Sequence, residues 1–197
     1  MNFASGARRL SLLLLLGTLL AAAPGQNSAP PSVLESAERK IAYVRENGNS
    51  EHPVTTPTVL TAEECNAYLN DGGRLPSGVS NVRFHAQPGV VQGEADVDFD
   101  QLTARRTRNN PLLMLFTGRH HVTALAQASA DHGVAHVQIQ SIEFDGVTIP
   151  KFALEYFAAK FLRPKYGAAY SVDSTFHLKN RIDSALPGDE RVTIVQR

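Results

Sequence analysis

The feature that most constrains the fold of this chain is an alternation of apolar and polar residues on both sides of Pro88-Gly89. Apolar or small residues take every second position: Val82, Phe84 and Ala86 before the dipeptide, and Val91, Gly93, Ala95, Val97 and Phe99 after it. A period of two is typical of strands with one buried face, and Pro-Gly favours a tight turn. A turn here would place Phe84 opposite Gly93 and Val82 opposite Ala95, on one face. We therefore expect an antiparallel hairpin that packs on a core.

A second, longer hairpin is predicted over residues 117–144, with its turn at residues 131–133. Its first strand carries small side chains at period two: Val122, Ala124, Ala126 and Ala128. In its second strand the apolar phase changes between Ile139 and Ile142, which indicates a β-bulge that bends the strand. Asp145-Gly146 is a further turn signal.

Three helices are predicted around these hairpins. Residues 32–47 place apolar side chains at steps of three and four, the spacing of an amphipathic helix. Thr61 and Glu64 have the spacing of a capping box, which opens a second, short helix. Residues 151–162 form a strongly apolar helix, which Pro164 should close because proline interrupts helical hydrogen bonding.

The C-terminal region predicts one more two-stranded unit. Its outgoing strand is either 174–178 or 182–186, residues 187–190 turn, and residues 192–195 return. Long hairpins combined with a few helices are typical of the α+β class. We expect a single α+β domain over residues 32–197, in which a curved antiparallel sheet of long hairpins packs around or against helices.

The N-terminus has the order of a cleavable secretory signal peptide. The first nine residues contain two arginines and no acid, an apolar run follows as far as Leu20, and small residues come next. The apolar run is shorter than the roughly 20 residues that span a bilayer. We expect residues 1–25 to be a signal peptide cleaved near Ala22 to Gly25, and residues 26–31 to be a linker. The mature protein would then be periplasmic or extracellular.

Charge and cysteine content narrow the function classes. Without Arg8 and Arg9, the 19 basic residues fall to 17 against 19 acidic ones, near −2, which disfavours a nucleic-acid-binding protein. One basic cluster is interpreted as a solvated turn or as a contact for anionic headgroups: Arg105, Arg106 and Arg108. Cys65 is the only cysteine, so no internal disulfide forms, and its two acidic neighbours disfavour a reactive thiolate. We expect it to be buried and structural.

Side chains that carry catalysis or bind metals form no recognisable motif. The seven histidines lack metal-ligand spacing, and the adjacent His120 and His121 would point to opposite faces of a strand. Three carboxylates alternate at period two and are interpreted as a solvated strand face: Asp96, Asp98 and Asp100. A hydrolase that uses this face with His85 or His121 stays open as an alternative. We predict no enzyme, metal or cofactor.

Two segments, residues 112–116 and residues 152–162, are unusually apolar. Both could fill the core, or they could enclose a cavity for a lipid tail, where each buried methylene contributes about 0.8 kcal/mol. The candidate ligand-binding residues are Leu112, Leu115, Phe116, Phe152, Tyr156, Phe157 and Phe161.

Three short motifs carry a resemblance to a known superfamily. They are Leu60–Leu69 (LTAEECNAYL), Leu75-Pro76 followed by the strand Val79–Val82, and Ile142–Pro150 (IEFDGVTIP). They resemble exported bacterial proteins that are similar to single-domain members of the tubular lipid-binding (TULIP) superfamily. The resemblance implies a strongly curved antiparallel sheet wrapped around a long helix, with lipid held between them, and it implies no catalytic residues.

These observations predict a non-catalytic binding protein of the periplasm or cell envelope. Its expected partner is a lipid or another apolar small molecule, with transient contact to a membrane surface and no nucleic acid. Two alternatives stay open: an envelope module for protein–protein interaction, and an unrecognised hydrolase.

Overall fold

The structure is a computed structural model that describes residues 31–102, 111–167 and 171–197. The predicted signal peptide and the arginine cluster at 105–108 lie outside these residues. The helical elements are α1 (Pro31–Asn49), α2 (Ala62–Asn70), α3 (Phe99–Leu102), η1 (Pro111–Phe116), α4 (Lys151–Phe157), η2 (Ala158–Leu162) and α5 (Arg163–Tyr166). The strands are β1 (Thr58–Thr61), β2 (Val79–Gln87), β3 (Val90–Asp98), β4 (Arg119–Asp131), β5 (Val134–Phe144), β6 (Val147–Thr148), β7 (Asp173–His177), β8 (Ile182–Gly188) and β9 (Arg191–Gln196).

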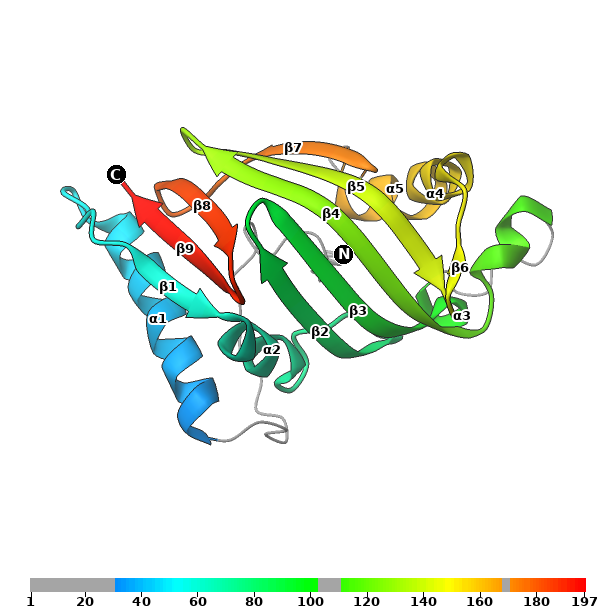
Figure 1. The fold of residues 1–197 in the computed structure, drawn as a ribbon, viewed down its shortest axis with the longest axis horizontal. Coiled ribbons are helices and arrows are strands. Elements are labelled where there is room, and N and C mark those ends of the chain that lie inside the picture. Colours follow the sequence, from blue (N-terminus) through cyan, green and yellow to red (C-terminus); the bar gives the residue numbers. More distant parts are fainter. Residues whose placement is uncertain (1–30, 103–110, 168–170) are drawn as a thin grey trace, which may run out of the picture.

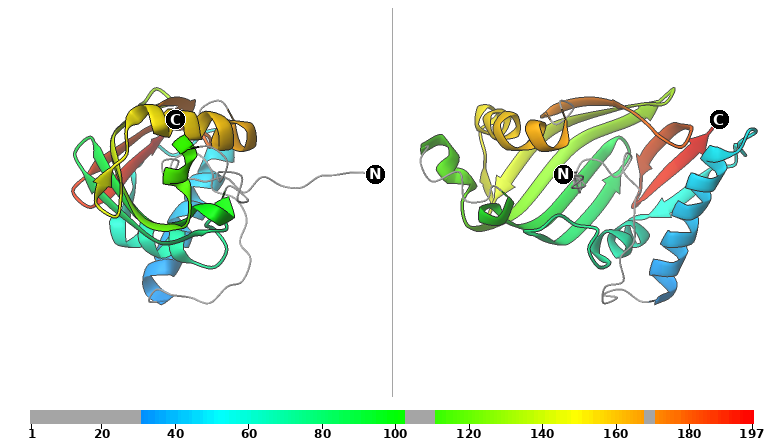
Figure 2. Two further views of the ribbon diagram at one scale, coloured as in Figure 1. Left: turned by 90° about the vertical axis from the view of Figure 1, so that its right-hand side faces the viewer. Right: turned by 180° about the vertical axis from the view of Figure 1, so that it is seen from behind.

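Six strands form a curved, open antiparallel sheet, as Figure 1 shows. The order is β2-β3-β4-β5, and both β6 and β7 pair with the free side of β5, at different ends of that strand. The helical segment α4–η2–α5 covers one end of the sheet, and α2 lies beside β2 at the other (Figures 1 and 2). The predicted α+β fold with a curved sheet of long hairpins is confirmed.

The registers of both long hairpins match the sequence patterns. Phe84 lies opposite Gly93 as predicted, and a bulge between Ser80 and Arg83 sets both Asn81 and Val82 against Ala95. Asn81 adopts φ 53°, a left-handed conformation that asparagine tolerates. The predicted bulge of the second hairpin is also present, because Leu125 pairs with Ser141 and Ala126 with Ile139, which leaves Gln140 over. This extra residue helps to bend the sheet.

A second sheet of three strands, in the order β1-β9-β8, packs against the far end of the large one (Figure 1). Of the two predicted outgoing strands, 182–186 is the one in the last hairpin, because β8 pairs with β9. Residues 174–178 were wrong for this role, since β7 joins the large sheet beside β5. Backbone hydrogen bonds link the sheets, for example from Glu190 N to the carbonyl of Ala86 at 2.8 Å. Helix α1 lies along the three-stranded sheet and contacts β1 and β9 (Figure 2).

Helix α2 protects the exposed edge of β2. Its N-terminus has the predicted capping box, with Glu64 N donating to Thr61 Oγ1 at 3.1 Å and Thr61 N to Glu64 Oε2 at 2.9 Å. One turn further, the amide of Asn66 accepts from Phe84 N at 2.6 Å and donates to the Phe84 carbonyl at 3.1 Å. Asn70 makes the same pair of bonds to Val82. These two side chains replace a neighbouring strand, which limits edge-to-edge pairing.

The apolar helix runs past the predicted stop at Pro164. After α4, the segment η2 widens into a π-helical turn, and α5 continues to Tyr166 with Pro164 in its first turn. Proline lacks an N–H and its ring clashes with the carbonyl four residues earlier in a regular helix. The wider turn removes the need for that bond, so the prediction of a helix end was wrong by about one turn.

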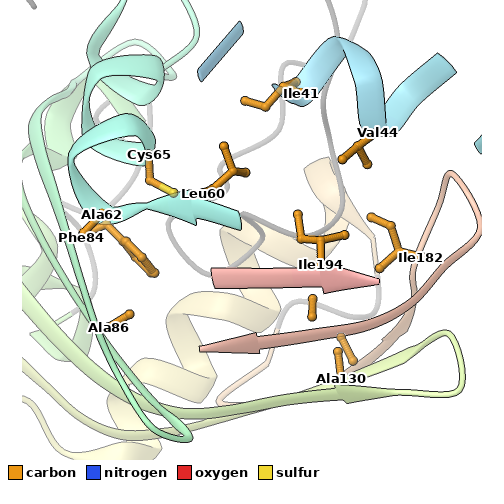
Figure 3. Packing of buried hydrophobic residues seen from close by; sticks show 12 residues of the cluster. Ile41, Val44, Leu60, Ala62, Cys65, Phe84, Ala86, Ala130, Ile182 and Ile194 are labelled. Atoms are coloured by element: carbon orange, nitrogen blue, oxygen red, sulfur yellow. The ribbon is translucent and has the colours of Figure 1, made fainter. Parts of the chain in front are cut away.

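Buried side chains form two large clusters, one at each end of the large sheet. The cluster beside α1 and α2 is mainly aliphatic, and Figure 3 shows Ile41 and Val44 of α1 above Ile182 and Ile194. The other cluster lies beneath α4 and is rich in phenylalanine: Phe99, Phe116, Phe144 and Phe157. The small residues of β4 lie between them on the concave face.

Candidate functional site

A cavity of about 170 Å³ lies between the concave face of the large sheet and the α4–η2 segment. Seventeen of its nineteen lining residues are apolar, and the other two are Ser171 and Ser174. The sheet contributes Val79, Val97, Val122, Ala124, Val137, Ile139, Ile142, Phe144, Ser174 and Phe176. The helical segments and the turn before β7 contribute Phe99, Leu102, Phe116, Leu154, Phe157, Ala158, Leu162, Ser171 and Val172.

Small residues on both the sheet and the helical segment leave room for the cavity. Ala124 of β4 and Ala158 of η2 both line it, where larger side chains would fill the space. An engineered cavity of about 150 Å³ lined by aliphatic and aromatic side chains stays dry and binds benzene. A cavity of 170 Å³ therefore has room for an aromatic ring or a short stretch of acyl chain.

One wall of the cavity is a packed group of phenylalanines. The rings of Phe116 and Phe157 stack with their centroids 4.2 Å apart. Phe99 meets Phe157 edge-on at 5.7 Å and lies 4.9 Å from Phe144. Such aromatic pairs contribute about 0.5–1.5 kcal/mol each beyond the area that they bury. This wall is held in place by its own packing and does not need a ligand to form.

A polar cluster borders the cavity where the chain enters β7. Glu155 Oε2 accepts from Arg163 Nη2 at 2.6 Å, and its Oε1 accepts from Ser171 Oγ at 2.9 Å and from Val172 N at 3.2 Å. The hydroxyl of Ser174 donates to the Ser171 carbonyl at 2.9 Å. The hydroxyls of both serines thus donate to protein acceptors. Their oxygens also accept, Ser171 Oγ from Arg163 Nη2 and Ser174 Oγ from Ser171 N, each at 3.3 Å.

The predicted ligand-binding residues divide into two groups. Phe116 and Phe157 are buried and line the cavity. Leu115, Phe152 and Tyr156 are exposed and are not among the lining residues. Phe161 packs on Phe157 at 5.2 Å between ring centroids but is also outside the lining, and the side chain of Leu112 is not among those described.

Most of the sheet residues that line the cavity were not among the predicted ligand-binding residues. The alternation that predicts the strands also identifies which face is buried, so Ala124, Val137 and Ile139 were visible as core positions. No sequence signal showed that the helix would lie across β4 and β5. The period-two pattern assigns residues to a face, and it leaves open where on that face a space remains.

The three aspartates of the hydrolase alternative do not converge in a cleft. Asp96 accepts from Asn81 and lies 3.0 Å from His121 Nδ1 on the exposed face of the sheet. Asp98 instead accepts from the backbone of Gln101, and Asp100 lies in α3, not on the strand. The predicted alternation of all three on one strand was therefore wrong, because the strand ends at Asp98. His85 Nδ1 lies 3.3 Å from Glu190 Oε2, in a separate contact.

His120 and His121 face opposite sides, as adjacent residues on a strand must. His120 stacks on Phe144 with a centroid distance of 5.5 Å, behind the aromatic wall of the cavity. Its two ring nitrogens lie 2.6 Å from Asp145 Oδ2 and 2.9 Å from the Thr117 carbonyl oxygen. Hydrogen bonds from His120 and from the backbone of His121 lower the pKa of Asp145. This contact fixes the turn at Asp145 to the start of β4.

Among the described residues, the cysteine is shielded from solvent and no metal ligands are grouped. Cys65 is buried, and burial raises the pKa of its thiol to about 12, so the predicted structural role fits its position. Within the described part of the chain, no three His, Cys, Asp or Glu side chains are grouped so that they could hold a metal ion. None of the helices among these residues has the length and apolar character needed to cross a membrane.

Comparison with known proteins adds no assignment to this geometry. No protein-family model, curated protein or solved structure gives a significant match to the chain. The cavity and the residues around it are therefore the observations that bear on function.

Proposed function

We propose that the protein binds a small apolar ligand, or the apolar part of a lipid, in the cavity between the concave sheet and α4–η2. The proposal includes export to the cell envelope, as the N-terminal sequence predicts. The supporting observation is an almost wholly apolar cavity that one helix covers. Burial of each ligand methylene there would contribute about 0.8 kcal/mol, and micromolar affinity corresponds to about 8 kcal/mol, so the few methylenes that fit the cavity supply part of such an affinity.

The volume sets a limit on the ligand. The cavity volume of about 170 Å³ is close to that of a cavity that binds benzene, so a complete long acyl chain is too large for it. We expect the ligand to insert a ring or the end of a chain and to leave its polar part near Ser171 and Ser174. Because the protons of both hydroxyls are already donated to protein acceptors, a hydroxyl or amide headgroup, which can itself donate, suits the site better than a carboxylate, which cannot.

The first test is native mass spectrometry on protein purified without detergent. We expect a co-purified apolar molecule, which a fluorescent lipid analogue should displace. A neutral long-chain alcohol should compete better than a fatty acid of the same length. Repeated recovery of a ligand-free species that also ignores the fluorescent probe would refute the proposal.

A pair of variants on β4 localises the binding to the cavity. Ala124→Leu adds three carbons to the cavity lining and should weaken probe binding about tenfold or more, equivalent to about 1.4 kcal/mol. Thr123→Leu, at the adjacent position on the opposite face, is the matched control. Circular dichroism melting of both variants confirms that they are folded. Equal probe affinity in both would show that the probe binds elsewhere.

A further inference from the structure

Exposed apolar side chains gather at the end of the molecule where α4 lies. Five of the nine large hydrophobic residues that are exposed in the described chain belong to η1, β6 and α4. We call them the apolar end surface: Met114 (63% exposed), Leu115 (44%), Val147 (65%), Phe152 (64%) and Tyr156 (39%). Segment η1 contacts α4, and β6 directly precedes α4 in the chain. Figure 1 shows all three on its right-hand side.

The helix that carries this surface is cationic. From residue 151 to residue 166 the sequence has four basic residues and one acid. The acid, Glu155, is satisfied by Arg163 and Ser171 and faces the cavity rim. Lys151 lies 3.3 Å from Asp173 in an exposed pair, which contributes little. Counting Glu155 and Asp173 against the four basic residues still leaves the segment an excess of two positive charges.

Lys160 shows how the charge and the apolar residues are combined. Its Nζ lies 5.9 Å from the ring centroid of Tyr156 and 5.8 Å from that of Phe161. The aliphatic stem of such a lysine covers apolar surface while its ammonium stays in a polar layer. Aromatic rings beside lysines are the combination that interfacial segments use at anionic bilayers.

The same helix forms a wall of the cavity with its other face. Leu154, Phe157 and Ala158 line the cavity, whereas Phe152 and Tyr156 point outward. A bilayer in contact with the outer face would therefore lie one helix away from the space that takes the ligand. This continuity favours a membrane over a soluble protein as the occupant of the surface.

We infer that the apolar end surface docks the protein onto a bilayer with anionic headgroups. The aromatic rings of Phe152 and Tyr156 lie at the boundary between headgroups and acyl chains, and Lys160 contacts phosphate. The inference rests on the proposed function in so far as the bilayer supplies or receives the ligand.

The experiment is vesicle flotation with the purified full chain. Vesicles of phosphatidylglycerol and phosphatidylcholine in equal parts are compared with vesicles of phosphatidylcholine alone. We expect clear binding to the first and weaker binding to the second. The double variant Met114→Ser and Phe152→Ser should bind the mixed vesicles at least about tenfold more weakly, because both side chains lose their insertion into the interface.

Two further variants separate the contributions. Leu186→Ser removes a leucine that is 51% exposed on β8, at the other end of the molecule, and should leave binding unchanged. Lys160→Gln should reduce binding to the anionic vesicles and leave binding to phosphatidylcholine unaltered. All variants keep the same N-terminus, so differences between them report on the surface alone.

Three outcomes of the vesicle experiment would overturn the inference. In the first, the double variant binds the mixed vesicles as strongly as the wild type does. In the second, Leu186→Ser loses as much binding as the double variant. In the third, the wild type binds neither kind of vesicle. Self-association in sedimentation experiments that the double variant abolishes would assign the surface to a second copy of the chain and also overturn it. Native mass spectrometry without vesicles is run on the same samples. If the protein retains a ligand but does not bind vesicles, this inference is refuted and the proposed function is not. If it binds vesicles but never carries a ligand, the proposed function is refuted and the docking is not.

Discussion

The two ends of the large sheet are closed in different ways. At the α1 end, aliphatic side chains are combined with buried polar groups that have hydrogen-bond partners, such as Asn47, which bonds Gln196 and the backbone of Val54. At the α4 end, the phenylalanine cluster leaves a cavity, the helix contains a π-helical turn, and apolar side chains remain exposed. π-helical turns occur frequently at functional sites. The comparison supports the proposal that one end is a scaffold and that the other end binds the ligand.

The largest expected effect is at the scaffold end. A Cβ on Gly48 would lie 2.3 Å from the backbone carbonyl oxygen of Asn180, so α1 packs directly on that turn. Gly48→Ala should lower the free energy of unfolding by about 3 kcal/mol, the upper part of the range for overpacking. The matched control is Gly188→Ala, where the nearest atom is 3.9 Å away. Urea unfolding measures both, and an equal change in the two variants would contradict the close packing of α1.

A smaller effect is expected from the buried carboxylate between α1 and α2. Burial alone would raise the pKa of Glu64, but hydrogen bonds from Lys40, Ser36 and the backbone of Thr61 outweigh it, so the pKa is lowered. Glu64→Gln should cost about 2 kcal/mol at neutral pH, since hydrogen bonds to a charged group are lost. Lys40→Gln is a useful companion, because it removes the partner and keeps the carboxylate.

The pH dependence gives the same site a sharper test. A lowered pKa means that Glu64 stabilises the folded state fully above its ordinary value of 4.5, and that this contribution is lost as pH falls through the folded pKa. The difference in stability between wild type and Glu64→Gln should therefore be constant near neutrality and shrink below about pH 4.5. Chemical unfolding at a series of pH values measures it, and a difference that grows on acidification would contradict the hydrogen-bond pattern.

The next effect concerns the edge of β2. Asn66→Ala removes both bonds to the backbone of Phe84 and should cost about 1 kcal/mol in urea unfolding. It should also raise the tendency to aggregate, because part of the strand edge becomes free. Arg83→Ala is the control, since Arg83 is an exposed residue of β2 next to Phe84 and its backbone is not left-handed. Unchanged stability in Asn66→Ala would show that α2 does not contribute to covering the edge.

Local sequence patterns predicted the strands, but they did not predict contacts between segments that are far apart in the sequence. The turn at Pro88-Gly89, the second hairpin and its bulge all follow from alternation and turn residues within about 30 positions. The capping box at Thr61 was predicted for the same reason. The bonds from Asn66 to β2 depend on where α2 packs, and no spacing within the helix indicates them. The apolar helix was predicted, but a segment that is apolar on most sides does not show which face will be covered, so Phe152 and Tyr156 were grouped with Phe157.

Cys65 gives a direct test, without any substitution, of how independent the two ends are. Its thiol is buried in the scaffold cluster with a pKa raised to about 12, so a thiol reagent should react only when this end of the molecule opens. A ligand in the cavity stabilises the whole folded state, by about 2.7 kcal/mol at a hundred times its dissociation constant. If Cys65 reacts through global unfolding, saturating ligand should slow the reaction about a hundredfold. If it reacts through local opening of α1 and α2, the rate should not change, and the two ends are then separate folding units. We expect the first result, because β2 and β4 belong to both clusters and connect them.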